Sequence, residues 1–219
     1  MKVIECVQGS PAWVAARLGR PTCSNLDKIL TPATLKPSRS ADGYANTLLA
    51  EWLLGHPLDD IGSGFMERGA ALEANARAWF SFTHDLPVVE VGFCTTDDGA
   101  VGGSPDGLVG DDALLELKTP SAKVHVGYLL DNDALVAEYR SQVQGYLWLT
   151  GRSVAYLCSF SPVMASVVVQ VPRDPAYMTA LDRALPDFCA KLASARARLI
   201  ALGCRPRKPL TGTTSGYPF

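Results

Sequence analysis

Residues 104–118 read Ser-Pro-Asp-Gly-Leu-Val-Gly-Asp-Asp-Ala-Leu-Leu-Glu-Leu-Lys, and this stretch predicts a β-hairpin that carries two acids and a lysine. Its middle, Gly-Asp-Asp, is typical of a turn because Gly and Asp tolerate left-handed backbone. Side chains of a strand alternate between its two faces, so Glu116 and Lys118 share one face. A loop with an odd number of residues, centred on Asp111, places Asp106 opposite Glu116 on that face, whereas a two-residue loop separates the acids. We therefore expect an odd loop or a bulge.

The two acids and the lysine have the chemistry of a metal-dependent phosphodiesterase. Carboxylate oxygens suit Mg²⁺ or Mn²⁺, so Asp106 can bridge one or two ions and Glu116 can bind one, with the Leu117 carbonyl completing the ligand set. A bound ion lowers the pKa of its water, and Lys118 can orient the attacking hydroxide and offset negative charge. The pattern Pro105-Asp106, then Glu116-Leu117-Lys118, resembles the PD-(D/E)xK nuclease motif. The alternative is a polar hairpin with a surface ion pair between Glu116 and Lys118.

The composition is that of one globular domain. Of the 219 residues, 47% are hydrophobic, 19% charged and 8% aromatic, which fits a single α/β or α+β domain and not a disordered chain. No apolar run is long enough to span a bilayer, and the first residues lack the pattern of a signal peptide. Six scattered cysteines without a Cys-x-x-Cys pair predict reduced thiols in a cytoplasmic protein. The net charge of −2 argues mildly against a nucleic-acid partner, although a basic groove can coexist with an acidic outer surface.

Helical and strand patterns alternate along the chain, and neither a repeat nor an internal linker interrupts them. The expected helices cover a short segment from Ser10-Pro11, a second one after Thr22, and residues 44–54, 65–83, 121–150 and 174–202. The expected strands cover residues 88–94, 100–103, 107–109, 114–118, 153–160 and 165–171. We therefore predict one domain over residues 1–204, followed by a tail over residues 205–219.

Two further candidates lie in helices on either side of the hairpin. Glu73 has Arg77 four residues later, so a solvated ion pair worth about 0.2–0.5 kcal/mol is the simpler interpretation of both. Gln142 and Tyr146 also lie four residues apart on one helical face, where function and packing explain them about equally well. Neither pair identifies a site alone.

Five features in order along the chain resemble the phage lambda exonuclease family of viral recombination nucleases, within the PD-(D/E)xK superfamily. They are Arg17-Leu-Gly with Thr22 and Ser24, Arg68-Gly with Glu73, Ser104-Pro-Asp-Gly, Glu116-Leu-Lys118, and Gln142-Val-Gln. The resemblance covers nearly the full chain. It implies an α/β (α+β) fold with a restriction-endonuclease-like core, in which helices flank a central mixed β-sheet.

The resemblance also implies an activity. Enzymes of this family are processive, Mg²⁺-dependent exonucleases, which digest one strand of duplex DNA from its 5′ end. They leave a 3′ single-stranded tail for a partner annealing protein. They are toroidal homotrimers with the duplex entering a central channel, encoded by phages or prophages and active in the bacterial cytoplasm.

Residue roles follow from the resemblance by position and fall into two groups. The catalytic group comprises the metal ligands Asp106, Glu116 and the Leu117 carbonyl, the catalytic lysine Lys118, and Glu73 and Gln142, which would support the metal-bound water and the scissile phosphate. The pocket for the 5′-terminal phosphate would comprise Arg17, Ser24 and Ser104.

Arg17 and Ser24 also suit a phosphate on physical grounds. A guanidinium can bind phosphate through two hydrogen bonds, and Ser24 lies at the expected start of a helix, whose free N–H groups attract anions. The alternative is that Ser24 is an ordinary helix cap and Arg17 a surface residue. Two other functions also stay open: a site-specific or structure-specific endonuclease of the same superfamily, and a non-catalytic DNA-binding module that has kept the fold.

Overall fold

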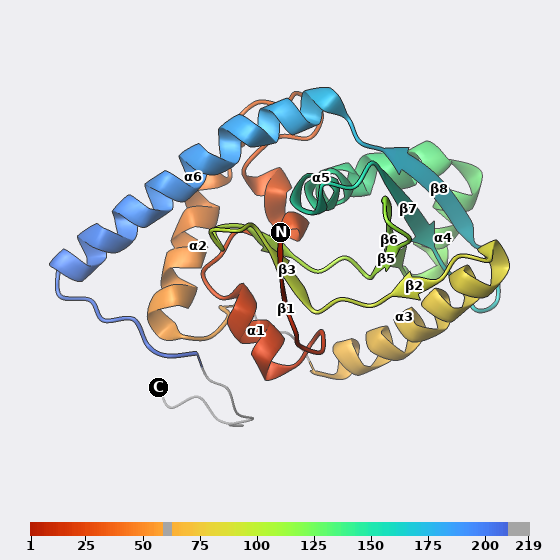
Figure 1. Ribbon diagram of the computed structural model, residues 1–219, viewed down its shortest axis with the longest axis horizontal. Helices are drawn as coiled ribbons and strands as arrows, with labels where there is room; N and C mark the ends of the chain where they lie inside the picture. The colour runs from red at the N-terminus through yellow and green to blue at the C-terminus, as the bar shows by residue number, and fades with distance from the viewer. Residues whose placement is uncertain (59–62, 210–219) are drawn as a thin grey trace.

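The computed structural model describes residues 1–58 and 63–209, with the side chains of residues 63–70 left aside. Within this part, helices surround two β-sheets (Figure 1). The helices are α1 (Pro11–Arg17), the 3-10 helix η1 (Cys23–Lys28), α2 (Ala41–Leu54), α3 (Ser63–His84), α4 (Ala122–Leu130), α5 (Asn132–Thr150) and α6 (Pro175–Ala201). The strands are β1 (Lys2–Ile4), β2 (Val88–Val89), β3 (Phe93–Thr95), β4 (Gly102–Gly103), β5 (Gly107–Val109), β6 (Ala113–Lys118), β7 (Val154–Ser159) and β8 (Val167–Pro172).

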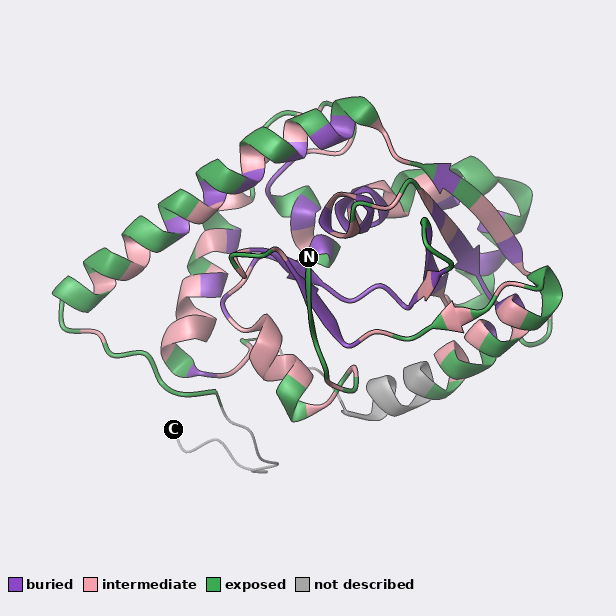
Figure 2. Ribbon diagram, in the orientation of Figure 1, coloured by how far each residue is buried: buried purple, intermediate pink, exposed green. Residues whose placement is uncertain are grey.

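The larger sheet has the strand order β2-β5-β6-β7-β8 and is covered by helices on both faces. It is mixed, because β6 and β7 are parallel while the other neighbours are antiparallel. Leu114 and Leu157 share a buried cluster with Leu147 of α5, whereas Leu115 shares another with Phe80 of α3. Figure 2 shows most of β6 and β7 and the inner side of α5 as buried. The predicted fold class, a central mixed sheet flanked by helices, is confirmed.

The hairpin of β5 and β6 has the predicted odd loop. Leu108 pairs with Leu114 and Val109 with Ala113, which leaves a three-residue loop, residues 110–112, centred on Asp111. Its first residue, Gly110, has the left-handed φ of 51° that favours glycine. One step beyond the pairing of Gly107 with Leu115, this register brings Asp106 opposite Glu116.

The predicted continuous strand over residues 88–94 is wrong. Val88–Val89 forms β2 at the edge of the larger sheet, whereas Phe93–Thr95 forms β3 in a separate sheet with the order β1-β3-β4. The chain changes sheets around Gly92, where an added Cβ would lie 2.4 Å from the Ile4 carbonyl oxygen of β1. The apolar run looks continuous in the sequence, but the close approach of β1 divides it.

The expected helix over residues 121–150 is also divided. Asp131 has extended backbone with φ −144° and ψ 95°, and its side chain accepts hydrogen bonds from the backbone N–H groups of Asp133 and Ala134. Asp131 therefore ends α4 and caps α5. Beyond this break, α5 packs on β7 and β8 of the larger sheet and on η1.

A second core joins η1, α2 and α6. Leu26, Leu48, Leu181 and Leu185 belong to this buried cluster, which fixes η1 and α2 beside each other. The backbone N–H of Arg207 donates to Leu53 of α2, so the first part of the predicted tail follows that helix. Residues 210–219 lie outside the described residues, and the division at residue 204 stays a prediction. In the described part of the chain, no helix is long and apolar enough to cross a membrane.

Candidate active site

The two acids of the hairpin are buried at the end of β5 and on β6. The relative exposure of Asp106 is 9% and that of Glu116 is 2%. The Asp106 Oδ2 atom accepts a hydrogen bond of 2.6 Å from the backbone N–H of Leu117, which fixes the carboxylate against β6. The residue after Asp106 is glycine, because a Cβ at position 107 would lie 2.1 Å from a methyl carbon of Val88. The Asp-Gly pair therefore brings an acid onto a strand end that β2 covers closely.

Helix α5 supplies the groups that meet Glu116 and Lys118. The Gln142 Nε2 atom donates to Glu116 Oε1 over 2.7 Å, and the Lys118 Nζ atom donates to Gln142 Oε1 over 3.0 Å. Lys118 Nζ also lies 2.7 Å from Glu116 Oε1. Gln142 Nε2 donates in addition to the Tyr146 hydroxyl over 3.1 Å. The structure thus unites Glu116, Lys118 and Gln142 in one network, and the simpler interpretation of a surface ion pair is wrong.

The burial of these charges changes their proton affinity. Burial first, and then the charge of Glu116, raises the pKa of Asp106 well above its ordinary value. Burial also raises the pKa of Glu116, against the lowering effect of Lys118. Burial alone would lower the pKa of Lys118, but the charges of Glu116 and Asp106 outweigh it, so that pKa is raised. The site therefore contains one ammonium group and two carboxyl groups, and the negative charges of the two carboxyl groups repel each other.

The carboxylates have free capacity for a cation. Glu116 Oε2 is buried and has no hydrogen-bond partner in the described structure. A buried carboxylate oxygen without a hydrogen-bond partner destabilises the folded protein unless it binds an ion or a water molecule. Among the described residues, no cluster of three Asp, Glu, His or Cys side chains forms a ready ligand cage. The donor set therefore fits a hard cation held by two carboxylates together with backbone carbonyl oxygen and water.

Helix α3 approaches the acids from the other side. Glu73 is half-buried, and its charge contributes to raising the pKa of both Asp106 and Glu116. Arg77 does not pair with Glu73: its Nη1 atom lies 2.6 Å from Glu90, and its Nε atom donates to the Asp106 carbonyl over 2.9 Å. The simpler interpretation of a solvated Glu73–Arg77 pair is wrong. Arg68, the other residue of this motif, lies among the side chains that are not described.

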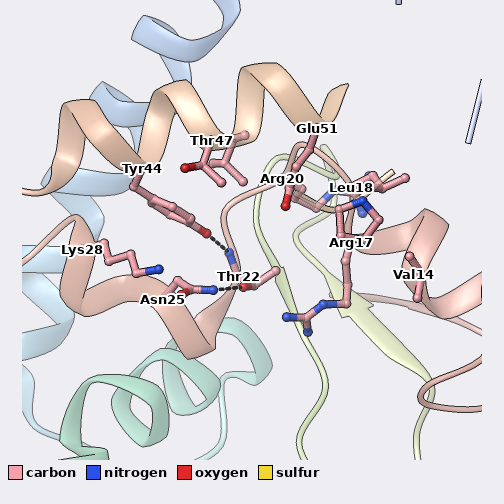
Figure 3. A pocket seen from close by; sticks show the side chains of 12 residues that line it. Val14, Arg17, Leu18, Arg20, Thr22, Asn25, Lys28, Tyr44, Thr47 and Glu51 are labelled. Atoms are coloured by element: carbon pink, nitrogen blue, oxygen red, sulfur yellow. Dashed lines mark hydrogen bonds between the residues drawn. The ribbon is translucent and has the colours of Figure 1, made fainter. Parts of the chain in front are cut away.

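Of the three residues assigned to a phosphate pocket, Arg17 and Ser104 are linked through Trp13, and Ser24 lies on η1. The Arg17 guanidinium lies 4.3 Å from the centre of the Trp13 ring, and Trp13 Nε1 donates to the Ser104 hydroxyl over 2.7 Å. The Ser24 hydroxyl lies 3.2 Å from that of Thr22. Ser24 is inside η1 and exposed, so it is not the helix cap. Beside Arg17 a cavity of about 200 Å³ opens, and Arg17 and Thr22 line it while Ser24 and Ser104 do not (Figure 3).

Comparison with known proteins decides the family. A model of the YqaJ-like viral recombinase domain matches residues 12–153, which is well over half of the chain. The chain belongs to the YqaJ-like viral recombinase family. No curated protein matches it.

Solved structures that resemble this chain include exonucleases. The alkaline exonuclease LHK-Exo from Laribacter hongkongensis has a TM-score of 0.75 and 28% identity, over 87% of this chain and 96% of that one. Its complex with dAMP has a TM-score of 0.74 and 29% identity over the same shares. A phage-related exonuclease from Haemophilus somnus shares the fold, with a TM-score of 0.65 and 16% identity over 84% of this chain and 96% of that one. The resemblance to the lambda exonuclease family is confirmed, and these likenesses support a nuclease.

Two aromatic residues beside the site were missed by sequence reasoning. Tyr139 of α5 places its ring centre 4.4 Å from Lys118 Nζ, and Trp13 connects Arg17 to Ser104. Trp13 and Arg17 are four residues apart in one helix, which is a usable signal for their contact. Tyr139 lies three residues before Gln142, on the same helical face, but only the packing of α5 on β6 shows what that face meets.

Proposed function

We propose that this protein is a Mg²⁺-dependent exonuclease that digests duplex DNA in the 5′-to-3′ direction and leaves 3′ single-stranded tails. The observation that carries the proposal is the buried acid pair beside Lys118, with the Glu116 Oε2 atom unpartnered. A protein rarely buries two neighbouring acids, one of them paired with an ammonium group, and leaves a carboxylate oxygen without a hydrogen-bond partner unless the site has a function. The alkaline exonucleases with similar folds support the same class of reaction.

Asp106 and Glu116, with the Leu117 carbonyl, would hold one or two Mg²⁺ ions, or Mn²⁺ in their place. When bound, the ion supplies an acidic water and balances charge on the phosphate. Lys118 keeps its proton at Nζ, where the ammonium group can bind the attacking oxygen and stabilise negative charge on the phosphoryl oxygens. Gln142 orients both partners, since its amide binds the Glu116 carboxylate through Nε2 and the Lys118 ammonium through Oε1. Glu73 would support the attacking water from α3.

The direction of digestion rests on the phosphate pocket. Arg17, Ser24 and Ser104 would bind the 5′-terminal phosphate, and the contact of Trp13 with two of these residues supports a single built pocket. A bound terminal phosphate beside the acids places the adjoining phosphodiester bond for cleavage. The products, 3′ tails, suit a single-strand annealing protein as partner in phage-type recombination. A toroidal homotrimer acting on duplex DNA with 5′-phosphate ends in the bacterial cytoplasm completes the proposal.

The test is a time course on linear duplex DNA labelled at either the 5′ or the 3′ terminus. With Mg²⁺ present, we expect the 5′ label to be released first as a mononucleotide, while a covalently closed circle survives. Chelation of the metal should stop the reaction. Cleavage of closed circles would favour the endonuclease, and the absence of cleavage at every duplex end would favour a DNA-binding module.

A further inference from the structure

The cavity beside Arg17 has an excess of positive charge. Arg17, Arg20 and Lys28 line it, and Glu51 is the one acid among its described lining residues. None of these three cations forms a salt bridge with a described carboxylate. Figure 3 shows Lys28 on one side of Thr22 and Arg17 on the other, which places cations on opposite walls.

The donors of the cavity are also incompletely used. Among the described residues that line the cavity, Arg20 has a buried nitrogen atom, Nη1, without a hydrogen-bond partner, and the charge of Arg196 outside the cavity repels this arginine. The Tyr44 hydroxyl accepts from the backbone N–H of Thr22 over 3.2 Å, so its own proton is available to another acceptor. Asn25 adds an amide, whose Nδ2 atom donates to Thr22 Oγ1 over 3.3 Å. Such a wall of N–H and O–H donors with surplus positive charge suits an oxyanion.

Size limits what this oxyanion can be. The cavity has about 200 Å³, which is less than the range of roughly 300–1,000 Å³ typical of sites for whole small-molecule ligands. A phosphoryl group with a few waters fits this space, whereas a nucleotide does not. We infer that the cavity walled by Arg17, Arg20 and Lys28 is a second phosphoryl-binding site, next to the pocket proposed for the 5′-terminal phosphate.

The phosphoryl group could come from two sources. One is free inorganic phosphate. The other is the outer part of a 5′-triphosphate end, reached past Arg17, which borders both sites; this source rests on the proposed function. The two sources share the same chemistry and are separated by experiment.

Binding of inorganic phosphate to the full-length protein, with metal chelated, is the first test. By calorimetry we expect saturable binding to the wild type, weakened about tenfold or more in Lys28→Gln, because a charge-assisted hydrogen bond is lost. Lys28 is exposed, so the variant should fold, which its unchanged melting temperature would verify. Lys191→Gln, at an exposed lysine of α6, is the matched control and should bind as the wild type does. Absence of saturable binding, or equal binding by Lys28→Gln and the control, would overturn the inference.

The second test compares digestion of linear duplex carrying a 5′-triphosphate or a 5′-monophosphate. If the site takes the outer phosphoryl groups of a DNA end, the ratio of triphosphate to monophosphate rates falls in Lys28→Gln relative to Lys191→Gln. If it takes free phosphate alone, that ratio is the same in all three proteins, while calorimetric binding still depends on Lys28. Calorimetry needs neither DNA nor metal, so a failure of the proposed nuclease activity leaves the first test intact.

Discussion

Lys118 has contacts that a structural lysine would not need. Its Nζ atom is 2.7 Å from Glu116 Oε1, 3.0 Å from Gln142 Oε1 and 4.4 Å from the centre of the Tyr139 ring. These three contacts fix the ammonium group at the acids instead of in solvent. We predict that Lys118→Ala lowers the turnover number by about 10²–10³-fold or more, since removal of one preorganised stabilising group has that effect. Calorimetry should still detect Mg²⁺ binding, because both carboxylates remain.

The matched control for this prediction is Lys123→Ala, which removes an exposed lysine of α4. It should leave both turnover and Mg²⁺ affinity as in the wild type. Full activity of Lys118→Ala would show that the lysine is not catalytic.

Asp106 illustrates a conflict between function and stability. Its buried carboxylate faces that of Glu116, and the two repel when no cation is present. Asp106→Asn keeps an oxygen that can accept from the Leu117 N–H but removes one charge. In chelator, we expect its free energy of unfolding to exceed that of the wild type by about 0.5–2 kcal/mol. In Mg²⁺, the melting temperature should rise for the wild type and stay constant for the variant; equal stabilisation of both by Mg²⁺ would reject Asp106 as a ligand.

The same pair predicts how stability without metal depends on pH. The pKa of Asp106 is raised in the folded protein, first by burial and then by the charge of Glu116. The unfolded chain, with an Asp pKa of about 3.9, therefore loses its proton at lower pH than the folded protein. The stability that Asp106 gives the folded protein through its raised pKa is complete below about pH 4. It is lost as the pH rises through the pKa of this group in the folded protein. Urea unfolding in chelator should show the stability advantage of Asp106→Asn over the wild type growing as the pH rises above about 4, and an advantage independent of pH would contradict this.

Asp106, Glu116 and Lys118 could be predicted from the residues alone because they lie on one hairpin. Strand alternation alone places Glu116 and Lys118 together, and the odd loop adds Asp106. The alternation says nothing of what covers that face. The family resemblance assigned Gln142 to the site, but the contacts of Gln142 and Trp13 depend on how α5 and α1 pack, which involves residues far apart in the chain.

At the scale of elements, prediction succeeded where one local rule decided the outcome. The turn residues fixed the register of β5 and β6, and the apolar patterns located α3 and α6 within a few residues. It failed for residues 88–94, because the division between β2 and β3 depends on β1, a strand some ninety residues earlier in the chain. Such a non-local pairing leaves no periodic signal.

The start of α6 gives a prediction about an element. Asp174 Oδ1 accepts from the backbone N–H groups of Ala176 and Tyr177 over 2.9 and 3.1 Å, and its Oδ2 atom lies 2.6 Å from Arg140 of α5. Asp174→Ala should lower the free energy of unfolding by about 1 kcal/mol through loss of the cap. The melting temperature should fall by about 2–4 °C, as measured by circular dichroism.

Asp174→Asn separates the two roles of this residue. The side chain at position 174 of this variant keeps an oxygen that can cap the helix but loses the negative charge that pairs with Arg140. We therefore expect Asp174→Asn to keep most of the stability that Asp174→Ala loses. Asp187→Ala, at an exposed acid inside α6, is the control and should melt as the wild type does. If Asp187→Ala destabilises as much as Asp174→Ala, the cap is not the cause.

At the scale of the whole molecule, the acid centre and the cationic cavity are adjacent. Tyr146 is buried between them: its hydroxyl binds Gln142 beside the acids, and it also acts on the pKa of Arg17. The net charge of −2 is small, but the charges are not evenly distributed: an acidic centre and a basic pocket lie side by side. A DNA strand has phosphates at the regular spacing that such a pair could bind together, one at the metal and one at the cations.

This arrangement predicts how the end of the DNA controls the reaction. Arg17→Ala removes the guanidinium that would bind the terminal phosphate, while the acids and Lys118 are left in place. Digestion of 5′-phosphorylated duplex should slow about tenfold or more, since a charged hydrogen bond contributes about 1.5–3 kcal/mol, whereas digestion of 5′-hydroxyl duplex should slow much less. Arg183→Ala, at an exposed arginine of α6, is the matched control for lost positive charge and should slow both substrates equally or not at all. An equal loss on both ends in Arg17→Ala would show that Arg17 stabilises the protein or binds DNA generally, and it would reject the terminal-phosphate pocket.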